Sequence, residues 1–102
     1  MDQSHLTGLL AKFVGMAAVR LPDDVIARLE EMRQTEDGEL ARAVYDSMFQ
    51  NQRLAIELGR PICQDTGIAQ FYIKAGTRSP YLDGLEPALK EAVLKASVQT
   101  PL

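Results

Sequence analysis

The fold of this 102-residue chain is decided in the stretch Ala55-Ile56-Glu57-Leu58-Gly59-Arg60-Pro61-Ile62-Cys63-Gln64-Asp65-Thr66-Gly67. Gly59 stands where a left-handed helix C-cap is expected, and Pro61 prevents a helix from continuing. The sequence before Gly59 has helical periodicity, whereas the residues after Pro61 are polar and turn-forming. We therefore expect a helix to end just before the thiol of Cys63 and to determine where that thiol lies.

Cys63 is the only cysteine of the chain, and an amide, a carboxylate, a hydroxyl and a glycine follow it directly. Such a run suits neither a helix core nor a strand face, so we expect a turn. A lone cysteine is most often a small buried hydrophobe. Burying the neighbouring Asp65 carboxylate, however, costs several kcal/mol unless it has partners. A site that binds a metal cluster and a polar substrate supplies such partners, which favours a functional Cys63.

Upstream of this turn, the apolar spacing predicts three amphipathic helices, at residues 4–20, from residue 23 to about residue 33, and at 39–58. Asp23 and Asp24 suit the positive end of the second helix. The third helix carries two adjacent apolar rows, formed by Leu40, Val44 and Met48 and by Ala41, Tyr45, Phe49 and Ile56. A stripe that wide predicts a helix buried on much of its circumference.

Downstream, residues 68–74 are rich in β-branched and aromatic side chains between two glycines and predict one strand. A loop at 76–83 and a last helix from Leu85 follow, with Pro87 tolerated in its first turn. The expected fold class is therefore α+β and mainly helical: three helices, one strand, one helix. A single strand lacks a partner for its backbone hydrogen bonds, which suggests that more polypeptide is needed.

The amino-acid composition restricts which partners and which cellular compartment we expect for this protein. With 46% hydrophobic residues the chain can fill one small core, so residues 1–102 are expected to form a single segment. A net charge of −3 and scattered basic residues argue against nucleic acid. No apolar run approaches the roughly 20 residues that span a bilayer. The N-terminal residues also lack the basic region with which a signal peptide begins. A lone cysteine fits a reducing compartment, so we expect a cytoplasmic protein without membrane contact.

The pentapeptide Cys63-Gln64-Asp65-Thr66-Gly67 behind Pro61 strongly resembles the cluster-ligand motif of class I iron-sulfur hydro-lyases, the family of class I fumarases and L(+)-tartrate dehydratases. The resemblance covers nearly the whole chain and is closer to tartrate dehydratase alpha subunits. It also rests on Leu21-Pro22-Asp23-Asp24-Val25, Met48-Phe49, Phe71-Tyr72-Ile73-Lys74 and Gly76-Thr77-Arg78-Ser79-Pro80. This likeness implies the N-terminal part of an alpha subunit, within a larger class I fumarase-like catalytic domain.

The resemblance also implies a chemistry. Cys63 is expected to ligate a [4Fe-4S] cluster together with two further cysteines outside this chain. Gln64 is expected to bind the substrate, and Asp65 to bind it and to orient or protonate the departing hydroxyl. The implied reaction removes water from a small dicarboxylate, L-tartrate to oxaloacetate, with malate and fumarate as the alternative pair. The implied partner is a beta subunit in an alpha2beta2 heterotetramer, and this piece alone is expected to be inactive.

Two other interpretations come from the residues themselves. Cys63 as a catalytic nucleophile needs a base, and the sole histidine, His5, is distant in sequence. Alternatively, the chain is a non-catalytic helical interaction module with a buried Cys63. For Gln64 and Asp65, the alternative to substrate binding is that each side chain caps its own turn.

Overall fold

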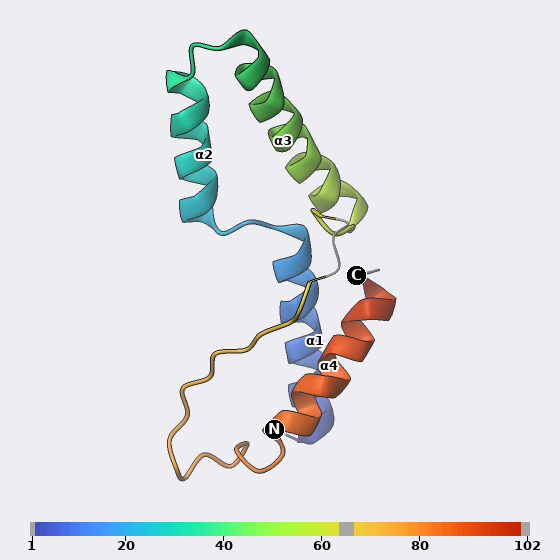
Figure 1. Cartoon of the computed structure of the whole chain (residues 1–102). Coiled ribbons are helices and arrows are strands. Elements are labelled where there is room, and N and C mark those ends of the chain that lie inside the picture. The colour runs from blue at the N-terminus through green and yellow to red at the C-terminus, as the bar shows by residue number, and fades with distance from the viewer. Residues whose placement is uncertain (1, 64–66, 101–102) are drawn as a thin grey trace.

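The computed structural model describes residues 2–63 and 67–100, and these form four helices joined by loops (Figure 1). They are α1 (Gln3–Val19), α2 (Asp23–Thr35), α3 (Glu39–Leu58) and α4 (Leu85–Gln99). Each lies within a few residues of the helix that the sequence predicts. Asp2 caps α1 by accepting the backbone N–H of His5 at 2.7 Å, as expected for a side-chain carboxylate at an N-cap.

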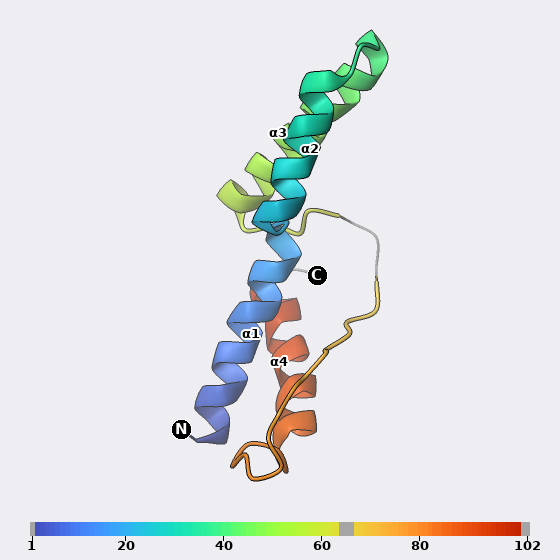
Figure 2. The same cartoon turned by 90° about the vertical axis from the view of Figure 1, so that its left-hand side faces the viewer.

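The predicted α+β fold class is wrong, because the described residues form helices and no strand. Residues 68–74, the expected strand, belong to an irregular segment that runs from residue 67 to the start of α4 (Figure 2). Ile68 and Tyr72 in this segment are 87% and 92% exposed. Strand propensity reflects how well side chains fit a pleated, half-buried surface. No neighbouring strand in the described chain offers such a surface, so the apolar composition of this segment does not produce a sheet.

The buried core lies between α1 and α4, which run side by side in the same direction (Figures 1 and 2). It is made of small residues at every fourth position of the two helices: Thr7, Ala11 and Gly15 on α1, and Ala88, Ala92 and Ala96 on α4. Residues four apart share one face of a helix, so the two stripes let the backbones approach closely. The core therefore depends on close packing of small groups and contains no large, fully buried side chain.

Contacts at both ends hold the parallel arrangement of α1 and α4. At the first end the side-chain amide of Gln3 donates a hydrogen bond to the carbonyl oxygen of Gly84, directly before α4. At the other end, a Cβ placed on Gly15 would come within 3.0 Å of the Thr100 hydroxyl oxygen. Thr100 is the C-cap of α4, so the last turn of α4 packs against α1.

The other two helices, α2 and α3, form an antiparallel hairpin that extends away from the α1–α4 pair (Figure 2). The molecule measures 54 × 28 × 21 Å and has a radius of gyration of 17.2 Å. A compact chain of this length is expected to have a radius of gyration of about 13 Å. The described chain is therefore much more open than a self-contained globular domain. No helix within it has both the length and the apolar character needed to cross a bilayer.

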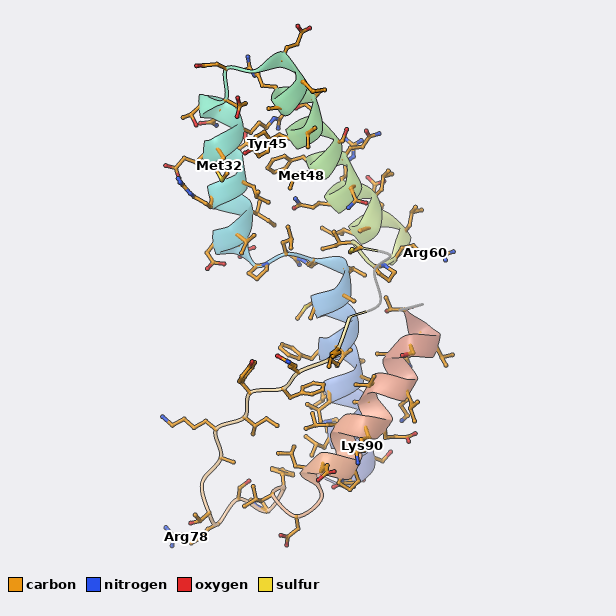
Figure 3. The ribbon with its side chains drawn as sticks, in the orientation of Figure 1. Met32, Tyr45, Met48, Arg60, Arg78 and Lys90 are labelled. Carbon is orange, nitrogen blue, oxygen red and sulfur yellow. The ribbon has the colours of Figure 1, made fainter. Side chains whose placement is uncertain are left out.

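The predicted deep burial of α3 is also wrong. Only Gln52 and Ala55 of this helix are buried, while Leu40 and Val44 in its first apolar row are 81% and 53% exposed. Tyr45 of the second row and Met48 of the first lie on the side of α2 (Figure 3), whereas nothing in the described chain covers Leu40 and Val44. Three methionines at helical positions whose spacing predicts a place in the core are likewise substantially exposed: Met16, Met32 and Met48. Within the part of the chain that the structure describes, the wide apolar stripe of α3 is therefore largely left without cover.

Candidate functional site

The position of Cys63 begins with the end of α3. Gly59 adopts the left-handed conformation, with φ 62° and ψ 40°, as the sequence predicted. The carbonyl oxygen of Ala55 accepts hydrogen bonds from the backbone N–H groups of Gly59 and of Arg60, the latter at 3.0 Å. A bond of the second kind is typical of the Schellman motif, which satisfies a carbonyl that the helix end leaves without a donor. The chain thus leaves α3 in a defined direction.

Ile62, the residue before Cys63, is held through both of its backbone polar groups. Its N–H donates to the carbonyl oxygen of Ala18 at 2.9 Å, and its carbonyl accepts from the side-chain amide of Asn51 at 2.8 Å. Ala18 lies in the last turn of α1, where carbonyl groups have no donor within the helix. Cys63 therefore follows directly on the point where the C-terminal ends of α1 and α3 meet (Figure 1).

Cys63 is exposed at the end of this held segment. The interpretation in which Cys63 is buried in an interaction module is therefore wrong for this structure. The other predicted site residues, Gln64 and Asp65, lie outside the described residues, as does Thr66. Their expected roles stay predictions.

Electrostatics around the turn come from two helix ends and two arginines. The C-terminal end of a helix carries partial negative charge, and both α1 and α3 end beside this segment. Arg20 is the C-cap of α1, and Arg60 is the second residue after α3. Both are exposed cations at positions that complement the helix dipoles. Arg78, the second arginine that flanks the motif in sequence, lies far from Arg60 in the loop before α4 (Figure 3).

The geometry argues against a thiol–imidazole pair within this chain. His5 lies in the first turn of α1, whereas the cysteine segment contacts Ala18 at the other end of the same helix. At a rise of about 1.5 Å per residue, His5 is about 20 Å along the helix axis from that contact. A general base must come within hydrogen-bond reach of its nucleophile. His5 is thus not the base that a Cys63 nucleophile requires.

The described residues 2–63 and 67–100 contain no group of three or more His, Cys, Asp or Glu side chains able to hold a metal ion. Cys63 offers one donor, the sulfur of an exposed side chain that directly follows the hydrogen-bonded Ile62. Thiolate is the donor that iron–sulfur clusters require. The residue fits one corner of such a cluster, and the other thiolates have to come from elsewhere.

An open apolar groove runs along α3 and ends beside the cysteine segment. It is lined by Leu40, Ala43, Val44, Ser47, Met48 and Asn51. Asn51 is the groove residue that also bonds Ile62. Figure 3 shows Tyr45 and Met48 projecting from α3 on the side of α2. The groove therefore joins the exposed apolar row of α3 to the segment that positions Cys63.

Neither Ala18 nor Asn51 was singled out from the sequence. Asn51 lies 11 residues before Ile62, and Ala18 is on another helix, so no local spacing connects them to Cys63. One signal was present in the sequence. Asparagine is a weak helix former, and it stands here beside the apolar stripe of a long helix.

The sequence of the chain is similar to a protein family and to individual members of it. The family model described as fumarate hydratase (Fumerase) matches residues 7–102. The L(+)-tartrate dehydratase subunit alpha of Escherichia coli (strain K12) is 42% identical over 99 residues, which cover 97% of this chain and 33% of that subunit. The putative L(+)-tartrate dehydratase subunit alpha of Methanocaldococcus jannaschii is 34% identical over 88 residues, or 84% of this chain and 31% of that one. The chain thus spans about a third of the curated relatives it matches, and no solved structure matches it.

Proposed function

This chain belongs to the fumarate hydratase family, and from that premise we propose that it forms the N-terminal part of the alpha subunit of an iron–sulfur hydro-lyase. The reaction we propose for the complete enzyme is the removal of water from a hydroxy-dicarboxylic acid, L-tartrate to oxaloacetate. The observation that carries this proposal is the 42% identity to a tartrate dehydratase alpha subunit over 97% of the chain. The family model is described as fumarate hydratase, which keeps malate and fumarate as the alternative pair.

The open shape of the molecule supports a larger subunit. The radius of gyration is 17.2 Å, and Leu40 and Val44 leave an apolar row of α3 largely uncovered. Contiguous exposed apolar surface usually marks an interaction site. In our proposal this row packs against the rest of the subunit, since the relatives are about three times longer than this chain. We also propose a beta subunit as partner, because both relatives are named as subunit alpha, and we propose that the two form an alpha2beta2 assembly.

We assign Cys63 as one of three thiolate ligands of a [4Fe-4S] cluster, the other two coming from outside these 102 residues. When bound, such a cluster supplies an iron with an open position that acts as a Lewis acid. Two observations support this assignment: Cys63 is exposed, and hydrogen bonds hold the backbone of Ile62 directly before it. A cluster of this kind requires reduced thiols, which agrees with a cytoplasmic location.

The residues after Cys63 are assigned to the substrate. Gln64 donates from its side-chain amide to a carboxylate or hydroxyl of the substrate. Asp65 binds the substrate as well, and its carboxyl group orients the departing hydroxyl or gives it a proton, so that the hydroxyl leaves as water. A positioned carboxyl group is suited to that proton transfer. These assignments rest on the family motif, because residues 64–66 lie outside the described structure.

The test is the Cys63→Ser variant in the complete alpha–beta enzyme, purified and reconstituted without oxygen. Serine keeps the shape of the side chain but removes the thiolate, so we expect lower iron and sulfide content and loss of dehydration. Ser97→Ala, a similar exposed change on α4, is the matched control and should retain both. Assays with L-tartrate, malate and fumarate identify the substrate. Full activity in the Cys63→Ser enzyme contradicts the proposal.

A further inference from the structure

Outside the family motif, two hydrogen bonds hold the backbone of Ile62 between α1 and α3. Its N–H bonds the carbonyl of Ala18 at the end of α1, and its carbonyl bonds the Asn51 side chain on α3. Pro61 precedes it and restricts the backbone further. Successive Cα atoms are about 3.8 Å apart, so holding both sides of Ile62 constrains where the Cα of Cys63 lies. Of the two bonds to Ile62, the one from Asn51 comes from a side chain.

We propose that Asn51 is a positioning residue for the cluster, acting through Ile62 to hold the backbone from which Cys63 ligates. The inference rests on the proposed function and adds a residue to it. The amide donates from Nδ2 to the carbonyl oxygen of Ile62 at 2.8 Å, an ordinary strong geometry for such a bond. Asn51 thereby connects α3 to the cysteine segment after the chain has turned away from that helix at Gly59.

The composition of α3 agrees with this role. Asparagine lowers helix stability relative to leucine or alanine, and Asn51 lines an otherwise mainly apolar groove. An amide at this position is explained by the bond to Ile62, because it satisfies a carbonyl that no helix or sheet pairs. At metal sites, groups that hydrogen-bond to a ligand act in a similar manner: they orient the ligand and raise its affinity for the metal.

The experiment uses the complete enzyme with three substitutions at Asn51. Asn51→Leu has similar volume and no donor, and Asn51→Asp replaces the donor with an acceptor that faces the Ile62 carbonyl. Asn51→His retains an N–H at a similar place and serves as the rescue variant. Gln50→Leu removes an exposed amide from the adjacent position of the same helix and is the matched control. Far-UV circular dichroism checks that each variant folds.

The readouts are iron and sulfide content, the rate of cluster loss to a chelator, and the rate at which a disulfide reagent modifies Cys63 in the cluster-free protein. Without the donor we expect cluster loss and thiol modification to change by about 3- to 10-fold, the factor expected of one ordinary hydrogen bond. Asn51→His should recover most of this change, and Gln50→Leu should show none.

Two results overturn the inference, and only one of them also overturns the proposed function. Asn51→Leu and Asn51→Asp enzymes that load and retain the cluster like the wild type, with unchanged thiol reactivity, show that Asn51 has no positioning role while the proposed function stands. A wild-type enzyme that takes up no cluster under the same reconstitution overturns the proposed function, and the positioning role falls with it.

Discussion

Arg33 on α2 and Asp46 on α3 form an ion pair of 2.7 Å, the one pair among the described residues that joins two different helices. The guanidinium of Arg33 also lies 5.2 Å from the ring centroid of Phe49 and 3.4 Å from Glu30. Arg33 therefore links α2 to α3 through charge and through an aromatic face. The packing between these helices is otherwise sparse, so this one side chain has an unusual share in holding the hairpin.

Replacing Arg33 with alanine is expected to loosen the α2–α3 hairpin by about 1 kcal/mol. The value is small because the side chains of Arg33 and Asp46 are 39% and 60% exposed, and solvent screens them. Arg28→Ala, which removes a pair within α2 only, is the control. Hydrogen exchange of the full chain should show faster exchange in α2 and α3 for Arg33→Ala alone. Equal protection in the two variants contradicts the prediction.

The Gly59→Ala variant should destabilise the end of α3 by about 1–2 kcal/mol, because alanine is strained at positive φ. Gly76→Ala is the matched control, since a Cβ there meets nothing within 4 Å and its φ is not positive. Urea unfolding of the full chain measures the difference. In the complete enzyme we also expect Gly59→Ala to lower iron content, because this residue directs the chain toward Cys63. An effect no larger than that of Gly76→Ala argues against a role for the cap.

Two glycines of α1 should respond in opposite ways to alanine. Gly8→Ala meets no atom within 4 Å, so the full chain should gain about 0.5–1 kcal/mol from better helix propensity. At Gly15 the new Cβ would lie 3.0 Å from the Thr100 hydroxyl oxygen, so the gain should vanish or reverse. Thermal unfolding of both variants tests this. Equal stabilisation by the two substitutions means that α1 and α4 are not packed as closely as described.

Asp65→Asn is expected to keep the cluster spectrum of the complete enzyme while lowering kcat by about 10²–10⁴-fold, the range for loss of a general acid. The residue is two positions beyond Cys63 and cannot replace a thiolate. Spectra and steady-state rates, measured on the same preparation, separate the two effects. Unchanged turnover, or cluster loss without a distinct rate effect, contradicts this role.

The 102-residue chain alone should self-associate, retain little iron after anaerobic reconstitution and show no dehydration. A single thiolate leaves a cluster exposed to exchange and oxidation. Leu40, which is 81% exposed on α3, is expected to contribute to the association. Leu40→Glu should shift the chain toward the monomer in light scattering, whereas Gln50→Glu, the charge control on the same helix, should not. A monomeric, cluster-loaded, active wild-type chain contradicts the fragment proposal.

Much of the local structure could be predicted from sequence because its causes are local. The apolar spacing of α3 and the Gly59 cap involve neighbouring residues, and both are confirmed. The predicted strand at 68–74 failed for the opposite reason: a strand exists only where another backbone completes its hydrogen bonds. The burial of Leu40 failed likewise, since burial depends on what packs against a face and not on the face itself.

By itself the sequence determined four helices, the left-handed cap at Gly59 and membership of the fumarate hydratase family. Each depends on short-range periodicity, backbone preference or a contiguous motif. Only the tertiary structure decided that Ala18 and Asn51 meet at Ile62, and so which residues hold Cys63 in place. That contact joins α1, α3 and the cysteine segment, which are separated along the chain. It forms only when packing brings the ends of the two helices together, and no pattern within one helix specifies it.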